Sequence, residues 1–248
     1  MLRGLWHLTW LELKIFLREP MGALGTVLMP ALAFFGASLA GNSIAPERFG
    51  SSQFARVGLP VLAATLMAIS AVLSLVTIIA VYREGGILKR LRATPLRPVT
   101  IVAAHVLVKL LLTAATLVVL ALLGRRAAMP PPGASLMSFA VALLFSTAAI
   151  LSLGFLLASV VRTARFAQPF GALVLYPMLA LSGVFVPVDS LPRGLQVAAQ
   201  FLPLTHAVAL LQGAWLGTPW IAQLGHVGAL IVFAIASAVI ASRVFRWE

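Results

Sequence analysis

Long apolar runs, separated by short polar segments, dominate this chain. A helix that crosses a membrane needs about 20 largely apolar residues, and six runs meet that requirement. The connectors between the runs are short and rich in turn-forming residues, so we expect no separate soluble domain. The sequence therefore predicts an all-α, polytopic membrane protein that forms a single transmembrane domain over residues 1–248, with six transmembrane helices at about 21–41, 57–81, 99–123, 136–160, 168–187 and 221–242.

The first 20 residues have a different pattern, in which charged and apolar positions are interleaved. Arg3, His7, Lys14 and Arg18 recur at helical spacings, and most of the leucine and tryptophan side chains fall on the other side. The pattern is typical of an amphipathic helix in the membrane interface, with a soluble helix packed on a partner as the alternative. The continuous apolar run of a removable signal peptide is not found here. We expect an N-terminal interfacial helix over residues 1–20.

The segment 188–216 is apolar but interrupted by prolines, so it cannot form one continuous spanning helix. Two short helices fit better: one begins near Asp189 with Pro192 in its first turn, and the other begins near Thr205. Irregular backbone is not tolerated in contact with lipid, so we expect a re-entrant helical hairpin, sheltered by protein, between spans five and six. Its predicted role is an outer gate, with candidate residues Phe185, Pro187, Asp189, Pro192 and Pro203.

Composition and charge support the membrane class. Only 10% of the residues are charged and 61% are hydrophobic, whereas a soluble domain has about 25% charged residues. The net charge of +12 would suit a nucleic-acid partner, but the positive-inside rule explains it better. With the N-terminus inside, 12 lysines and arginines fall on the inner side and 5 on the outer side. We therefore expect both termini in the cytoplasm, contact with membrane lipids, and no nucleic-acid partner.

The inventory of reactive residues excludes several mechanisms. None of the six acidic residues lies in the middle of a predicted span, whereas an ion-driven transporter normally keeps a carboxylate there. The chain has no phosphate-binding loop for ATP and no protease or hydrolase motif. It has no cysteine, and its four histidines show no metal-ligand spacing. Lys109, within the third predicted span, can snorkel to the cytoplasm or contact a substrate. The sequence therefore predicts a chain that is not an enzyme and that carries no metal or cofactor.

The loop 82–98, between the second and third predicted spans, holds six of the 24 charged residues. On a helix over 83–94, three apolar side chains share one face, the basic side chains take the other, and Glu84 lies near the N-terminus. One interpretation is a positively charged anchor on lipid phosphates. The other is a docking helix that passes the motion of a soluble partner to the spans. An anchor requires neither Glu84 nor the pair Gly85 and Gly86, and on the residues alone both interpretations stay open.

From Glu84 onward, the residues EGGILKRLRATPL resemble the loop between the second and third spans of ABC type-2 permeases, the membrane subunits of ATP-binding-cassette exporters. The segments LSGVFVPVDSLPRGL at 181–195 and FLPLTH at 201–206 resemble the other signature of that family. Gln212 stands where the family often has an arginine, which puts any role of that arginine in doubt. Importer permeases have a different loop, which begins with E-A-A.

The resemblance implies a permease that assembles with a second permease copy, as a homodimer or heterodimer, and with a separate ABC ATPase subunit that holds ATP and Mg. It implies export of a hydrophobic or amphipathic cargo (a drug, antibiotic, lipid or glycolipid) across a bacterial-type cytoplasmic, or inner, membrane, along a path lined by the second and fifth spans. The alternative is a scaffold that docks an ATPase without transport. The residues expected to couple the chain to the ATPase are Arg83, Glu84, Gly85, Gly86, Leu88, Lys89, Arg90, Leu91, Arg92 and Pro95.

Overall fold

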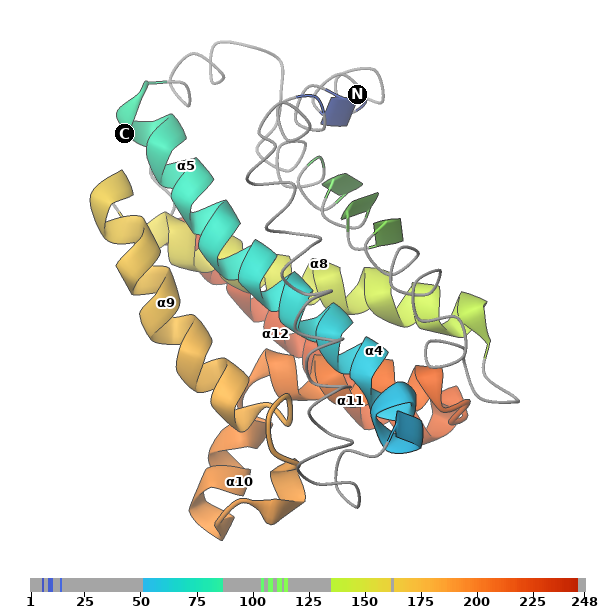
Figure 1. Ribbon diagram of the computed structural model, residues 1–248. Helices are drawn as coiled ribbons and strands as arrows, with labels where there is room; N and C mark the ends of the chain where they lie inside the picture. Colours follow the sequence, from blue (N-terminus) through green and yellow to red (C-terminus); the bar gives the residue numbers. More distant parts are fainter. Residues whose placement is uncertain are drawn as a thin grey trace.

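The computed structural model describes residues 51–86, 135–161 and 163–244, together with positions 6, 9, 10, 14, 104, 107, 108, 111, 112, 114 and 115. Every regular element in this part of the chain is helical (Figure 1), which confirms the all-α class for the described residues. The elements are α4 (Ser51–Ile69), the π-helix η1 (Ser70–Ser74), α5 (Leu75–Glu84), α8 (Leu136–Val160), α9 (Ala164–Leu181), the 3-10 helix η2 (Val188–Ser190), α10 (Arg193–Gln200), α11 (Pro203–Trp215), the 3-10 helix η3 (Trp220–Gln223) and α12 (Leu224–Val244).

Three helical stretches in the described residues are long and apolar enough to cross a membrane: Pro60–Glu84, Leu136–Val160 and Trp220–Val244. The pair α10 and α11, bent by 85°, would make a fourth if the two helices form one broken span. The predicted fifth span corresponds to α9, which is not among these stretches. The first predicted span and most of the third lie outside the described residues, so the number of six spans stays a prediction.

The predicted interfacial helix is described at four positions, all of them helical. Trp6, Trp10 and Lys14 are exposed, whereas Thr9 is buried. These four positions do not separate apolar from charged side chains, because two tryptophans and Lys14 are exposed together. The other charged positions of the segment lie outside the described residues, and its location in the membrane interface stays a prediction.

Several predicted boundaries in the second half of the chain differ from the structure by a few residues. The fifth predicted span, 168–187, is replaced by α9, which starts at Ala164 and ends at Leu181. Its end is fixed by Gly183, whose φ of +86° is the left-handed conformation that glycine adopts after a helix C-terminus. The predicted pair of short helices is present, but α10 starts after Pro192 instead of near Asp189. The second helix, α11, starts at Pro203 itself, because proline suits the first turn of a helix.

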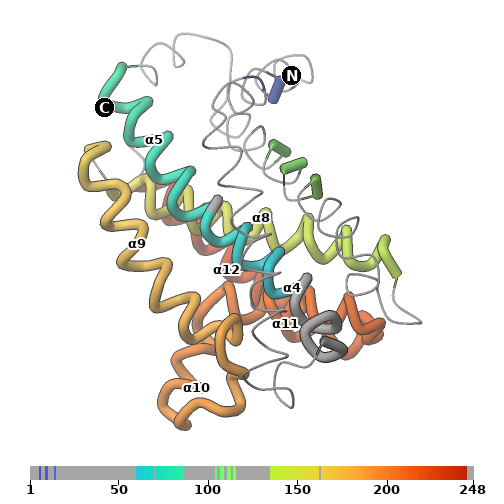
Figure 2. The backbone as a smooth tube through the Cα atoms, viewed as in Figure 1, coloured from blue at the N-terminus to red at the C-terminus, as the bar shows by residue number. Residues whose placement is uncertain are grey.

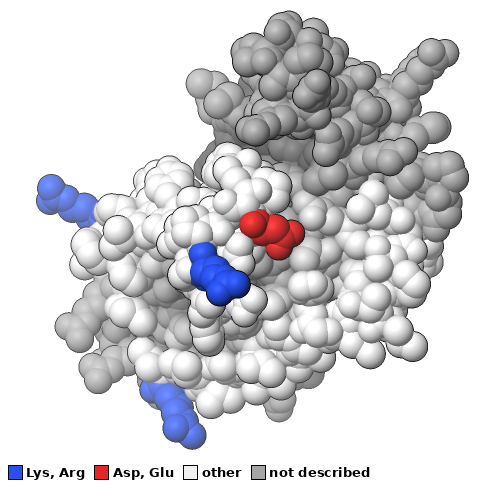
Figure 3. All heavy atoms as spheres, turned by 90° about the horizontal axis from the view of Figure 1, so that it is seen from below, with Lys and Arg blue, Asp and Glu red and all other residues white. Residues whose placement is uncertain are grey.

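The second predicted span forms a continuous rod made of α4, η1 and α5 (Figures 1 and 2). α8 packs against this rod and against α11 and α12, and α9 packs against α5 and η1. α9 runs from beside the end of α5 towards α10, which lies at the opposite end of the molecule (Figure 1). The view from that end shows few charged side chains among the described residues, with one basic and one acidic side chain close together near the middle of the face (Figure 3), as expected for a chain with so few charges.

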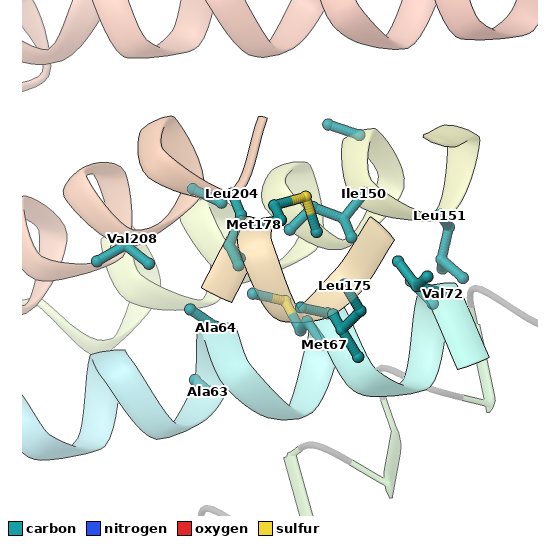
Figure 4. Packing of buried hydrophobic residues seen from close by; sticks show 14 of the residues in the cluster. Ala63, Ala64, Met67, Val72, Ile150, Leu151, Leu175, Met178, Leu204 and Val208 are labelled. Atoms are coloured by element: carbon teal, nitrogen blue, oxygen red, sulfur yellow. The ribbon is translucent and has the colours of Figure 1, made fainter. Parts of the chain in front are cut away.

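The buried core lies where the rod meets α8, α9 and α11 (Figure 4). Met67, Leu175 and Leu204 are large side chains with almost no exposed surface, and alanines fill many of the positions between them. In lipid, apolar side chains gain little by leaving the solvent, so close packing at small residues is what holds membrane helices together. The small buried residues of this core include Ala63, Ala64, Ala68, Ala71, Ala142, Ala149, Gly154, Ala158, Ala167 and Gly171.

Two glycines hold the π-helix η1 between its neighbours. At Gly154 of α8, an added Cβ would collide with the carbonyl oxygen of Ala71. At Gly171 of α9, an added Cβ would lie 3.1 Å from Cδ2 of Leu73. A π-helical turn is wider than an α-helical turn and often occurs at functional sites. The middle of the second span is therefore enclosed by α8 and α9, and glycine is required where α8 passes over η1.

The packing at Gly154 predicts that Gly154→Ala is destabilising by about 1–3 kcal/mol, because the new methyl group overpacks the contact with the Ala71 carbonyl. The matched control is Gly228→Ala on α12, where no atom lies within 4 Å of an added Cβ. Thermal unfolding of the purified variants in detergent measures the difference. Equal unfolding midpoints for the two variants would show that the contact is not tight.

Candidate coupling site at the end of the second span

α5 ends at Glu84, and two glycines turn the chain away from the helix axis. The N–H of Gly85 donates to the carbonyl of Val81 at 2.9 Å, and the N–H of Gly86 donates to the carbonyl of Arg83 at 3.1 Å. Gly86 has a φ of +66°, which residues with a Cβ rarely adopt. The glycine pair therefore terminates a helix, as glycine commonly does at this position.

This termination corrects the predicted amphipathic helix over 83–94. Arg83 and Glu84 form the C-terminal end of α5 and do not begin a new helix. The prediction placed Glu84 at a helix N-terminus because it treated the glycines as a weak point within a helix, whereas they end one. The residues from 87 to 98, with Leu88, Lys89, Arg90, Leu91, Arg92 and Pro95, lie outside the described residues. Their expected contact with an ATPase stays a prediction.

The Arg83 side chain reaches the C-terminal end of α8. Its Nη1 donates to the carbonyl oxygen of Val161, and its Nη2 donates to the carbonyl oxygen of Ala158 at 3.3 Å. The last carbonyls of a helix have no partner within the helix, and a cation near them is favourable because the helix dipole is negative at that end. Arg83 therefore caps α8 from another helix.

Glu84 reaches the N-terminal end of α9. Its Oε1 accepts a hydrogen bond from the backbone N–H of Ala164, the first residue of α9, at 2.9 Å. Thr163 occupies the N-cap position, but its side chain makes no capping hydrogen bond. The carboxylate of Glu84 thus performs the task that an N-cap side chain normally performs. Its negative charge is also favourable at the positive end of the helix dipole.

Together, the two side chains join α5 to the turn between α8 and α9. We call this group, Arg83 and Glu84 with their partners at Ala158, Val161 and Ala164, the α5 clamp. Each charge lies at the helix end of opposite sign, so the order Arg-Glu in the sequence matches the order of the two helix ends. The clamp residues Arg83 and Glu84 lie at the start of the segment 82–98, which the sequence predicts to be the coupling element.

Sequence reasoning identified Arg83 and Glu84 as site residues, and their expected coupling to an ATPase stays a prediction; their partners within the chain were not predicted. The partners belong to the turn between the fourth and fifth predicted spans, about 80 residues further along the chain. The signal available in the sequence was a single acidic residue next to a basic residue at the end of an apolar span, which marked the two residues as functional candidates. The turn itself was missed, because its contribution consists of backbone groups that any residue carries.

The proposed outer-gate residues do not gather in one place. Phe185, Pro187, Asp189 and Pro192 are exposed in the connection between α9 and α10, whereas Pro203 is buried at the start of α11. Gln196 of α10 donates to the carbonyls of Asp189 at 3.1 Å and Leu191 at 2.8 Å, and so holds this connection against α10. The role of these residues as a gate stays a prediction.

Comparison with known proteins places the chain in a functional context. The sequence model of the family described as ABC-2 type transporter matches residues 3–216. Nodulation protein J of Rhizobium leguminosarum bv. trifolii is 35% identical over 98 residues, which cover 40% of this chain and 37% of that protein. Nodulation protein J of Rhizobium meliloti (strain 1021) is 34% identical over 77 residues, which cover 31% of this chain and 29% of that protein. The chain thus spans well under half the length of these curated relatives in the aligned regions.

The geometry of the clamp predicts that Glu84→Ala weakens the start of α9 by about 1 kcal/mol, the usual effect of losing an N-cap. Thr163→Ala is the matched control, because the Thr163 side chain makes no capping hydrogen bond. Hydrogen–deuterium exchange of peptides that cover the first turn of α9 measures the effect, with faster exchange expected only for Glu84→Ala. Faster exchange in Thr163→Ala, with none in Glu84→Ala, would assign the cap to Thr163 instead.

Proposed function

The chain belongs to the ABC-2 type transporter family, and from this premise we propose that it is the permease subunit of an ATP-driven exporter. It is a multi-pass membrane permease component without ATPase activity of its own, and permeases of this family work with ATPase subunits. In our proposal, a separate ABC ATPase holds the ATP and Mg²⁺, and a second permease copy completes the transport path.

The α5 clamp is the observation that carries the proposed mechanism. A force applied to the loop after Gly86 acts first on the end of α5, where Arg83 contacts the C-terminal end of α8 and Glu84 contacts the start of α9. Because each hydrogen bond joins a charged side chain to a helix end, the contacts resist separation. We infer that the clamp passes the displacement of the loop to α9, the helix that occupies the predicted fifth span.

The acidic residues support an ATP-driven mechanism over an ion-driven one. Of the six acidic residues of the chain, Glu84 lies at the end of a span-length helix and Asp189 lies in the connection before α10. A carboxylate used for ion coupling is expected at membrane depth. The carboxylate of Glu84 accepts a hydrogen bond from the N–H of Ala164 at a helix end. This position favours a role in passing on movement between helices over a role in ion binding.

Exposed apolar surface supports a hydrophobic or amphipathic cargo. Leu173 and Tyr176 of α9 are 70% and 63% exposed, and Phe185 after α9 is 68% exposed. In the proposed dimer, this side of α9 faces the transport path, where a drug, antibiotic, lipid or glycolipid would contact it. The opposite side of α9 packs into the core through Leu175, Met178 and Leu179.

The proposed coupling separates docking from transmission, and this separation can be tested. We predict that the double substitution Leu88→Asp and Leu91→Asp abolishes co-purification with the ATPase, because it removes the apolar face of the predicted docking segment. Glu84→Ala and Arg83→Ala should retain co-purification, since both residues contact the chain itself. The two clamp variants should instead lower cargo transport per ATP hydrolysed several-fold in reconstituted vesicles. Loss of co-purification in the clamp variants would mean that these residues contact the ATPase directly.

Transport itself is tested with the permease and its ATPase in vesicles that contain a fluorescent phospholipid or an amphipathic dye. The proposal predicts ATP-dependent movement of the probe and stimulation of ATP hydrolysis. A complex that binds and regulates the ATPase, yet moves no probe, would favour the scaffold alternative.

A further inference from the structure

Two histidines that are 20 residues apart in the sequence meet where α11 packs against α12. Nδ1 of His206, in the first turn of α11, lies 3.1 Å from Nδ1 of His226, near the start of α12. Nε2 of His206 lies 2.9 Å from the carbonyl oxygen of Gln200, the last residue of α10. The ring of Phe233 lies beside His206, with centroids 6.2 Å apart. The pair therefore connects α10, α11 and α12 at the 85° bend.

The hydrogen-bond partners determine where the protons lie. A carbonyl oxygen only accepts, so Nε2 of His206 carries a proton and donates it to Gln200. A neutral His206 then has its lone pair on Nδ1, which accepts from the Nδ1–H of His226. This series of bonds also satisfies one of the last carbonyls of α10, which a helix leaves without internal partners. The arrangement is complete when both imidazoles are neutral, and one additional proton fits on Nε2 of His226.

We propose that His206 and His226 are positioning residues that hold the bend between α10 and α11 against α12, and that this latch opens when both imidazoles are protonated. A second additional proton must bind Nδ1 of His206, which removes the acceptor between the rings. It also places two positive charges about 3 Å apart, which is strongly unfavourable. Because histidine titrates between about pH 5 and 8, the latch is closed at the upper end of that range and opens on acidification.

The other ionisable groups on the elements packed around the histidine pair are of types that do not titrate in this range. Arginine, tyrosine and aspartate change charge outside about pH 5–8, so the histidine pair accounts for a response there. α8, which packs against both α11 and α12, carries no ionisable residue. The ionisable residues on the surrounding elements are Arg56 on α4, Arg165 and Tyr176 on α9, Asp189 on η2, Arg193 on α10 and Arg243 on α12.

The latch would regulate the proposed outer gate, and its effect on cargo release rests on the proposed function. The effect of the latch on conformation does not rest on the proposed function. Opening frees the start of α11 from α12 at one point. Nε2–H of the protonated His206 still donates to Gln200, and the buried side of α11 keeps its contacts with α8 and α4. The bend between α10 and α11 would therefore move away from α12, and the contact between the two imidazoles is the link that breaks.

Spin-label distance measurements on the full chain test this proposal. The sequence contains no cysteine, so Val197→Cys on α10 and Val232→Cys on α12, which are 55% and 65% exposed, accept labels specifically. We expect a second population at longer distance to appear on acidification from about pH 8 to about pH 5. The same labels in His226→Gln and in His206→Gln should show one distribution at both pH values. Labels at Leu144 of α8 and Val239 of α12, both exposed, provide the control that does not respond.

The outcomes separate the latch from the transport proposal. Absence of a pH response in the unsubstituted latch overturns the proposal, and this measurement needs no histidine variant to fold. An equal response in both glutamine variants also overturns it, because each of them retains only one imidazole at this position. A response that depends on both histidines supports the latch, even if the vesicle assay finds no transported probe, in which case the export proposal alone fails.

Discussion

The turn between α8 and α9 depends on two side chains from another helix, and the arrangement of the described helices depends on that contact. Helix ends carry carbonyl and N–H groups without internal partners. Arg83 supplies donors to the end of α8, and Glu84 supplies an acceptor to the start of α9. Because the two residues are adjacent on α5, this helix cannot move away from the turn without leaving both helix ends unsatisfied. The chain after Gly86 therefore begins at a point that is held to both α8 and α9.

Below the clamp, close packing at small residues keeps the same helices together. Gly154 lets α8 approach the carbonyl of Ala71, and Gly171 lets α9 approach Leu73. The π-helix η1 therefore lies between α8 and α9, the same two helices that the α5 clamp contacts. A rod that is held at its end by hydrogen bonds and at its middle by glycine contacts moves with α8 and α9 over this length. The bend at His206, in the first turn of α11, has a different kind of contact, between two imidazoles, which a change in protonation can break.

Some of this structure could be predicted from the sequence, because membrane spans are local features. The apolar run 136–160 predicted both ends of α8, and the run 221–242 predicted α12 to within three residues at each end. The prolines in the segment 188–216 predicted two short helices, because the effect of a proline on a helix is also local. Glu84 shows the limit of such reasoning. Its role depends on the N–H of Ala164, a group that carries no sequence signature and lies 80 residues away. The meeting of His206 and His226 depends in the same way on how α11 and α12 pack.

The central claim is that α5 and the start of α9 move as one body when ATP binds to the partner ATPase. Spin labels at Val81 of α5 and Phe166 of α9, both exposed, report the distance across the clamp in the reconstituted complex. Labels at Phe166 and Val239 report the movement of α9 relative to α12. We predict that ATP leaves the distance between Val81 and Phe166 unchanged and shifts the distance between Phe166 and Val239. A change across the clamp, with α9 fixed relative to α12, would contradict the account.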